Sequence, residues 1–138
     1  MAEVIVSELS TEERGELARV IMSILDSWGT SAEEKIALLA LPEGTRTRSL
    51  HKYYDHTPLP DEPEVSERIE HVLGIAKALR TSYPANPKMC RFWLNTRNHR
   101  FRNRTPLRTM IEDGLQGVVA VRVYLDCAYD WDTEEERN

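Results

Sequence analysis

Seven Lys and Arg side chains form the densest group of like charges in this chain. They lie between residues 88 and 108, a stretch without Asp or Glu, although the whole chain carries a formal net charge of -5. The seven are Lys88, Arg91, Arg97, Arg100, Arg102, Arg104 and Arg108. This asymmetry indicates a basic face on an acidic molecule. The alternative is a solvated loop whose charge is balanced by the acidic C-terminal tail.

The residue types that carry most catalysis and metal binding show no suitable pattern. The histidines lack metal-ligand spacing, and Cys90 and Cys127 lack the spacing of a zinc site. Both cysteines lie among apolar and aromatic residues, so we expect reduced thiols in the core. No glycine-rich phosphate loop or nucleophile turn occurs, and the carboxylates lie in solvated runs. We therefore expect neither an enzyme nor a bound cofactor or metal.

Three helical segments are predicted in the N-terminal part. Ser10 precedes two glutamates and apolar residues at helical spacing, which predicts a capped helix that ends near Trp28. Residues 32–41 form a second helix, capped by Thr30 or Ser31. After a break at Pro42, residues 46–54 form a short segment with basic residues on one side.

A helix, a turn with glycine and a short basic helix together outline a helix-turn-helix. Under that hypothesis, DNA is contacted by Arg46, Thr47, Arg48, His51 and Lys52. The alternative is a packed pair of helices with a hydrated basic side. The chain as a whole lacks the strongly basic balance that is usual for DNA-binding domains.

A proline-rich stretch separates this region from the second half. Residues 58–64 contain three prolines and cannot continue a helix, so they form a predicted linker. Residues 1–57 then form a helix-turn-helix-like region, residues 65–131 a second domain and residues 132–138 an acidic tail.

The second half also has a helical pattern. Helices are predicted from Val65 to about Thr81, over residues 88–96 and over residues 107–113, where Thr105 and Pro106 supply the start. Residues 115–130 are rich in β-branched side chains and suit a strand or a helix. We choose a helix because no neighbouring strand is predicted, so the expected fold class is all-α. Without an export signal or a run of ~20 apolar residues, we expect a cytoplasmic protein without membrane contact.

The order of residues in the second half carries a resemblance. The string comprises Glu67-Arg-Ile, Leu73-Gly-Ile-Ala-Lys-Ala-Leu79, Tyr83-Pro84, Trp93-Leu94-Asn95, Asn98, Phe101, Thr105-Pro-Leu107, Met110-Ile111, Gly114 and Val121-Arg-Val-Tyr-Leu-Asp126. Over roughly residues 66–128 this string resembles the toxin-binding domain of the MbcA/ParS/Xre antitoxin family. Residues 30–54 match less closely the helix-turn-helix region that precedes this domain in the family. The loop departs from the family pattern at Arg102-Asn103-Arg104, where Asn103 can still adopt a left-handed turn.

The resemblance implies a type II antitoxin that forms homodimers. It implies that the partner is a cognate toxin that consumes NAD, of the RES type or an ADP-ribosylating relative, whose active site the antitoxin occludes. Repression of its own operon is a further expectation. The residues expected to bind toxin are Asn98, Phe101, Arg102, Arg104, Thr105, Leu107, Arg122, Tyr124, Leu125, Asp126, Tyr129 and Trp131.

Two other interpretations stay open at this point. In one, the protein is a DNA-binding transcriptional regulator whose second half only dimerises. In the other, it is a dimeric scaffold without a toxin partner. Trp93 and Leu94 are more simply explained as core residues, because a tryptophan at helical spacing usually packs. Arg122, alone in a valine-rich stretch, must reach solvent or meet a partner.

Overall fold

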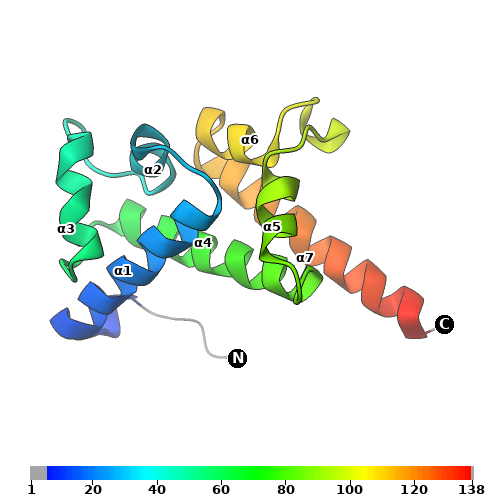
Figure 1. Ribbon diagram of the computed structural model, residues 1–138, viewed down its shortest axis with the longest axis horizontal. Helices are drawn as coiled ribbons and strands as arrows, with labels where there is room; N and C mark the ends of the chain where they lie inside the picture. Colours follow the sequence, from blue (N-terminus) through cyan, green and yellow to red (C-terminus); the bar gives the residue numbers. More distant parts are fainter. Residues whose placement is uncertain (1–5, 138) are drawn as a thin grey trace. The chain divides into compact units, whose positions relative to one another are not determined.

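The computed structural model describes the backbone of residues 6–137 and the side chains of residue 6 and residues 8–127. Within these residues the chain is helical and forms no strand, which confirms the predicted all-α class (Figure 1). In chain order, the elements are the 3-10 helix η1 (Val6–Glu8), α1 (Thr11–Ser27), α2 (Ala32–Leu38), the 3-10 helix η2 (Thr47–Leu50), α3 (His51–Tyr54), α4 (Pro63–Ser82), α5 (Pro87–Leu94), the 3-10 helix η3 (His99–Phe101), α6 (Pro106–Glu112) and α7 (Leu115–Arg137).

Two compact units divide the chain, unit 1 (Met1–Glu70) and unit 2 (His71–Asn138). The division falls inside α4, not in the predicted linker at residues 58–64. Helix α4 begins within that stretch because Pro63 occupies its first position, where the missing N–H of proline would have no helical partner anyway. The proposed domain ranges stay a prediction.

Reciprocal capping bonds start the first two helices of unit 1. The Ser10 hydroxyl accepts from the Glu13 N–H at 3.1 Å, and the Glu13 carboxylate accepts from the Ser10 N–H at 3.1 Å. Ser31 and Glu34 make the same pair at the start of α2. Both caps confirm the sequence prediction. Helix α2 ends at residue 38 and not at residue 41, because Ala40 has a φ of 52°, which ends the helical backbone.

One carboxylate joins three elements of unit 1. Asp26, at the end of α1, accepts from the Lys35 ammonium of α2 at 2.9 Å and from the Tyr54 hydroxyl of α3 at 3.0 Å. Lys35 is buried and also donates to the Thr30 carbonyl at 2.9 Å. The same elements supply buried apolar side chains to the core of unit 1: Ala18, Ile21, Met22, Leu25, Trp28, Leu38, Leu39, Leu50 and Tyr53.

Helix α4 confirms the predicted amphipathic helix and begins two residues before the predicted start. Leu73 and Ala76 belong to its predicted stripe but are only half-buried, whereas Ile75 is fully buried. The buried side chains are Val65, Ile69, Val72, Ile75, Ala78 and Leu79. They recur every three or four positions, as in a helix with one apolar face.

Helices α6 and α7 of unit 2 meet at close range. The Thr105 hydroxyl caps α6 by accepting from the Arg108 N–H at 3.0 Å, which confirms the predicted start. Gly114, with a φ of 63°, separates the two helices. A Cβ atom built on Gly117 would lie 2.2 Å from the Thr109 carbonyl oxygen. The absence of a side chain at Gly117 therefore lets the two backbones approach.

The segment that suited either a strand or a helix, residues 115–130, is helical and lies within α7. Its buried residues Val118, Val121 and Leu125 are three and four positions apart, which is the period of a helix. The helix continues to Arg137, through the residues predicted as a separate tail (Figure 1). Residues 128–137 contain no glycine or proline that would end it.

The two thiols differ in exposure. Cys90 is half-buried, its Sγ lies 3.6 Å from the Leu79 carbonyl oxygen, and burial raises its pKa. The prediction of a buried Cys127 is wrong, because this thiol is exposed on α7, four positions after the exposed Val123. Among the described residues, no helix is long and apolar enough to span a membrane. The cytoplasmic location stays a prediction.

Candidate functional site

Residues 95–104, which we call the basic loop, fold back on themselves between α5 and α6. The Asn98 N–H donates to the Arg104 carbonyl at 3.1 Å, and the Asn103 N–H donates to the Asn98 carbonyl at 3.2 Å. The Asn98 side chain accepts from the Arg100 N–H at 2.9 Å. Arg102 and Asn103 both have a φ of 60°, the left-handed conformation expected for Asn103. Each such residue costs about 1–2 kcal/mol, so other contacts must hold the turn.

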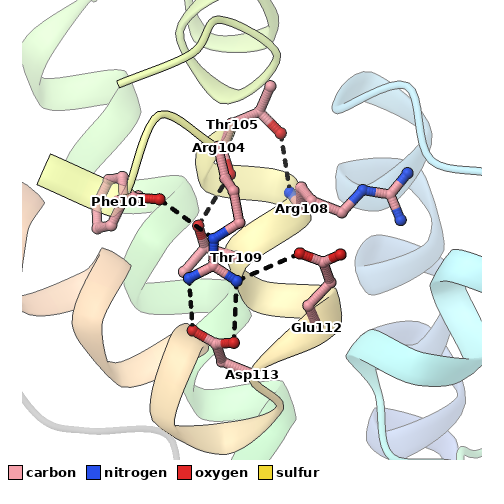
Figure 2. A network of polar contacts seen from close by, with 7 residues as sticks. All are labelled: Phe101, Arg104, Thr105, Arg108, Thr109, Glu112 and Asp113. Carbon is pink, nitrogen blue, oxygen red and sulfur yellow. Dashed lines mark hydrogen bonds and ion pairs between the residues drawn. The ribbon is translucent and has the colours of Figure 1, made fainter. Parts of the chain in front are cut away.

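The Arg104 network supplies those contacts (Figure 2). Its guanidinium donates two bonds to the Asp113 carboxylate, at 2.8 and 3.0 Å, and one to Glu112 at 3.3 Å. Its Nε donates to the Phe101 carbonyl at 3.2 Å. The bonds from Arg104 lower the pKa of Asp113, and the same pair raises the pKa of Arg104. One side chain thus ties the basic loop to the C-terminal end of α6.

An aromatic cluster holds the other side of the basic loop. The Tyr124 ring of α7 stacks on the Trp93 ring of α5, with centroids 5.8 Å apart and planes 11° apart. Phe101 meets the Tyr124 ring edge-on, with centroids 5.6 Å apart. The Arg100 guanidinium lies 5.9 Å from the centroid of the same ring. Two segments of unit 2, α5 and the basic loop, therefore converge on Tyr124 of α7.

Arg122 lies against helix α4. Its Nη1 donates to the His71 Nδ1 at 3.1 Å, and the side chain is half-buried. A Cβ atom on Gly74 would lie 2.6 Å from the Arg122 guanidinium. The glycine therefore leaves room for the guanidinium to pass over the helix, so Arg122 meets a partner within unit 2.

The predicted binding residues with described side chains divide into internal and exposed groups. Three of them are buried: Phe101, Leu107 and Leu125. Asn98 and Thr105 cap short helical segments. Arg104, Arg122 and Tyr124 make the side-chain contacts described above. Only Arg102 and Asp126 of the predicted set are exposed within the described part of the chain. The side chains of Tyr129 and Trp131 lie outside the described residues. The part that each residue takes in binding stays a prediction.

Several exposed residues near these positions were not predicted to bind. Phe92 is 61% exposed on α5, and Val123 is 53% exposed and Val119 37% exposed on α7. Only a search for apolar residues on the outer face of the helices would have found all three. Asp113 was also missed as the partner of Arg104, because no local spacing predicts that pair.

The predicted DNA-binding residues lie together in unit 1. Arg46, Thr47, Arg48, His51 and Lys52 are all exposed, on or next to η2 and α3. Element η2 packs against α2, and α3 packs against α1. The His51 ring donates to the Arg48 carbonyl at 2.6 Å. Helix α3 spans four residues, so a long recognition helix is not formed, and the helix-turn-helix interpretation stays a prediction.

Two features of the described residues bear on metal and ligand binding. Among the described residues, no cluster of His, Cys, Asp and Glu could hold a metal ion. The buried side-chain polar atoms of this part of the chain all have hydrogen-bond partners, so none points unpaired into a cavity. What unit 2 presents instead is a fixed loop with exposed guanidinium groups.

Part of unit 2 is similar to a known family of protein domains. Residues 79–128 match the family model described as the antitoxin Xre/MbcA/ParS C-terminal toxin-binding domain. The match confirms the resemblance in this part of the chain and covers the end of α4, α5, the basic loop, α6 and α7 as far as residue 128. The resemblance predicted for residues 66–78 lies outside the matched range. No curated protein matches the chain.

Proposed function

We propose that this protein is the antitoxin of a toxin–antitoxin pair, because residues 79–128 match the family model of the antitoxin Xre/MbcA/ParS C-terminal toxin-binding domain. One observation carries the proposal: the range that matches a toxin-binding domain coincides with a structured set of elements, from α5 into α7. The partner is a cognate toxin protein. The antitoxin acts by covering the active site of that toxin.

The toxin in this proposal consumes NAD and is of the RES or ADP-ribosylating type. The C-terminal end of α7 supports the mode of inhibition, because the sequence after Leu125 is rich in acids. Carboxylates there compete for the cationic groups that would hold the phosphates of NAD. Homodimers are part of the same proposal, since α7 exposes Val119 and Val123.

Co-expression tests the antitoxin role. The gene next to the one that encodes this chain is expressed alone and together with it, and growth and cellular NAD are followed. Toxicity with loss of NAD, both relieved by this protein, supports the proposal. Toxicity that this protein relieves, but that occurs without loss of NAD, would support the antitoxin role and contradict the proposal that the toxin consumes NAD. A harmless neighbour removes the antitoxin role and favours a dimeric scaffold.

Deletion of residues 130–138 tests the acidic end of α7. The truncated protein should still bind the toxin but inhibit it less, because the matched domain ends at residue 128. Undiminished inhibition would show that the acids do not act at the toxin's active site.

A second candidate function is repression of the protein's own operon. It is favoured by the joint exposure of Arg46, Arg48 and Lys52 on one short segment of unit 1. Binding to the operon's promoter DNA should fall steeply as salt rises, and charge reversal at these three residues should abolish it. Promoter binding that survives the reversal would contradict the assignment.

A further inference from the structure

The basic loop carries three guanidinium groups that its own fold leaves uncompensated. Arg97, Arg100 and Arg102 are exposed. Among the described residues, no ion pair joins any of them to a carboxylate, and the Arg100 guanidinium lies 5.9 Å from the centroid of the Tyr124 ring. An arginine stays charged at any pH that a folded protein tolerates. The loop therefore presents a fixed positive surface.

The carboxylates closest in sequence to this loop are already occupied. Glu112 and Asp113 follow the basic segment, and both accept from Arg104. The charge of Arg102 also lowers the pKa of Asp113, but by less than the hydrogen bonds from Arg104 do. By taking up both carboxylates, Arg104 leaves the other three guanidinium groups for an external partner.

The same residue fixes the shape of the loop. Arg104 bonds the Phe101 carbonyl from its side chain, while its backbone N–H donates to that carbonyl at 3.1 Å. These bonds bracket the left-handed pair Arg102 and Asn103. A loop held in one conformation loses less entropy on binding than a mobile one.

We propose that Arg97, Arg100 and Arg102 bind a carboxylate-rich patch on the toxin, and that Arg104 is a positioning residue that shapes this surface without touching the partner. The proposal rests on the proposed function. Guanidinium groups pair with carboxylates through two parallel hydrogen bonds, and arginine is enriched at binding hot spots.

A protein partner fits the surface better than a nucleic acid does. The loop lies inside the segment that matches a toxin-binding domain. Three aromatic rings beside it are engaged with one another: Trp93 stacks on Tyr124, and the buried Phe101 meets Tyr124 edge-on. Binding of single-stranded nucleic acid uses aromatic faces that are open for stacking on bases.

Charge reversal at the exposed positions is the first arm of the test. In full-length protein, Arg97→Glu with Arg102→Glu should weaken binding to the toxin encoded by the neighbouring gene by about tenfold or more, equivalent to about 1.4 kcal/mol. Arg and Glu both carry a Cβ atom, so the left-handed backbone at position 102 should cost about the same free energy in the natural protein and in the variant. Circular dichroism should show unchanged helix content.

A matched variant controls for net charge. Arg91→Glu with Arg108→Glu reverses the same number of charges on α5 and α6, and Arg108 points away from the Arg104 network (Figure 2). It should change the affinity for the toxin by less than about threefold. An equal loss in both variants, or no loss in either, would overturn the proposal.

The positioning role is tested by non-additivity. Arg104→Lys keeps the charge but loses the paired bonds to Asp113, so it should weaken toxin binding in the natural background. In the Arg97→Glu, Arg102→Glu background its further effect on toxin binding should be smaller, because two of the three groups it positions are gone. Equal losses in both backgrounds would show that Arg104 is merely structural.

Two further outcomes are also decisive. If the unchanged protein does not bind the toxin, the proposed function fails and this inference falls with it. If the loop variant keeps its affinity for the toxin but loses promoter DNA, the loop is a nucleic-acid surface and only this inference is overturned.

Discussion

The guanidinium of Arg104 and the carboxylate of Asp113 are joined by two hydrogen bonds, at 2.8 and 3.0 Å. The pair links a left-handed turn in the basic loop to the end of α6, nine positions away in sequence. It explains how a turn of two non-glycine residues is held in one conformation. It also explains why the most basic segment of the chain keeps exposed, uncompensated charge at its tip.

The Arg104–Asp113 pair should make the stability of unit 2 depend on pH. The pKa of Asp113 is lowered in the folded protein by Arg104, so the pair stabilises the fold above the ordinary pKa of an aspartate, about 4, and this contribution is lost as the pH falls through the lowered value. Asp113→Asn should lower the Tm at pH 7, and this loss should shrink as the pH falls below about 4. A Tm difference that is constant between these pH values would contradict the assignment. Asp126→Asn, at an exposed position on α7, is the control.

Gly117→Ala should destabilise unit 2. The new Cβ would meet backbone atoms, the Thr109 oxygen at 2.2 Å and its carbonyl carbon at 2.9 Å, so the helices must separate. We expect a loss of about 1–3 kcal/mol in the free energy of unfolding, measured with urea. Gln116→Ala, at the exposed neighbouring position, should change it by less than about 0.5 kcal/mol.

Gly74→Ala should lower the free energy of unfolding by less than Gly117→Ala does, although the new Cβ atom also clashes at position 74. The atoms in its way belong to the flexible end of Arg122, which can move aside at the expense of its bond to His71. Placing Gly74→Ala in an Arg122→Ala background should remove the cost, because the clash is gone. A cost that persists there would mean that something other than Arg122 fills the space above Gly74.

Tyr54 should ionise late in an alkaline titration. Burial, followed by its bond to Asp26, raises its pKa to about 12. Because this pKa lies above the unfolded value of about 10, the contribution to stability is complete below pH 10 and is lost as the pH rises through 12. The absorbance of tyrosinate should show a component near pH 12 that Tyr54→Phe removes. Tyr53 provides the comparison, since burial alone raises its pKa.

The sequence predicted best those features that depend on local chemistry. The caps at Ser10, Ser31 and Thr105 were predicted because a side-chain oxygen and the next turn suffice to start a helix. The helix over residues 115–130 was chosen because no neighbouring strand was predicted, and the buried Val118 and Leu125 lie at helical spacing in it. The all-α fold class and the resemblance confirmed over residues 79–128 followed from such local patterns.

Contacts between distant segments could not be predicted in the same way. Nothing in the spacing of Arg122 shows that it lies over Gly74, 48 positions earlier, and bonds His71. The residues of the family pattern were expected to touch the partner, yet Phe101 and Leu125 are buried. A residue required by the fold and one required by a partner give the same pattern in a single sequence, and only burial and contacts separate them.

The affinity of the purified full-length protein for the protein encoded by the neighbouring gene, measured by calorimetry together with NAD consumption by that partner, tests the central claim most directly. We predict a stable complex in which NAD consumption stops at saturating antitoxin, and an affinity about tenfold lower for the Arg97→Glu, Arg102→Glu variant. A partner that consumes NAD at the same rate with and without this protein would contradict the account.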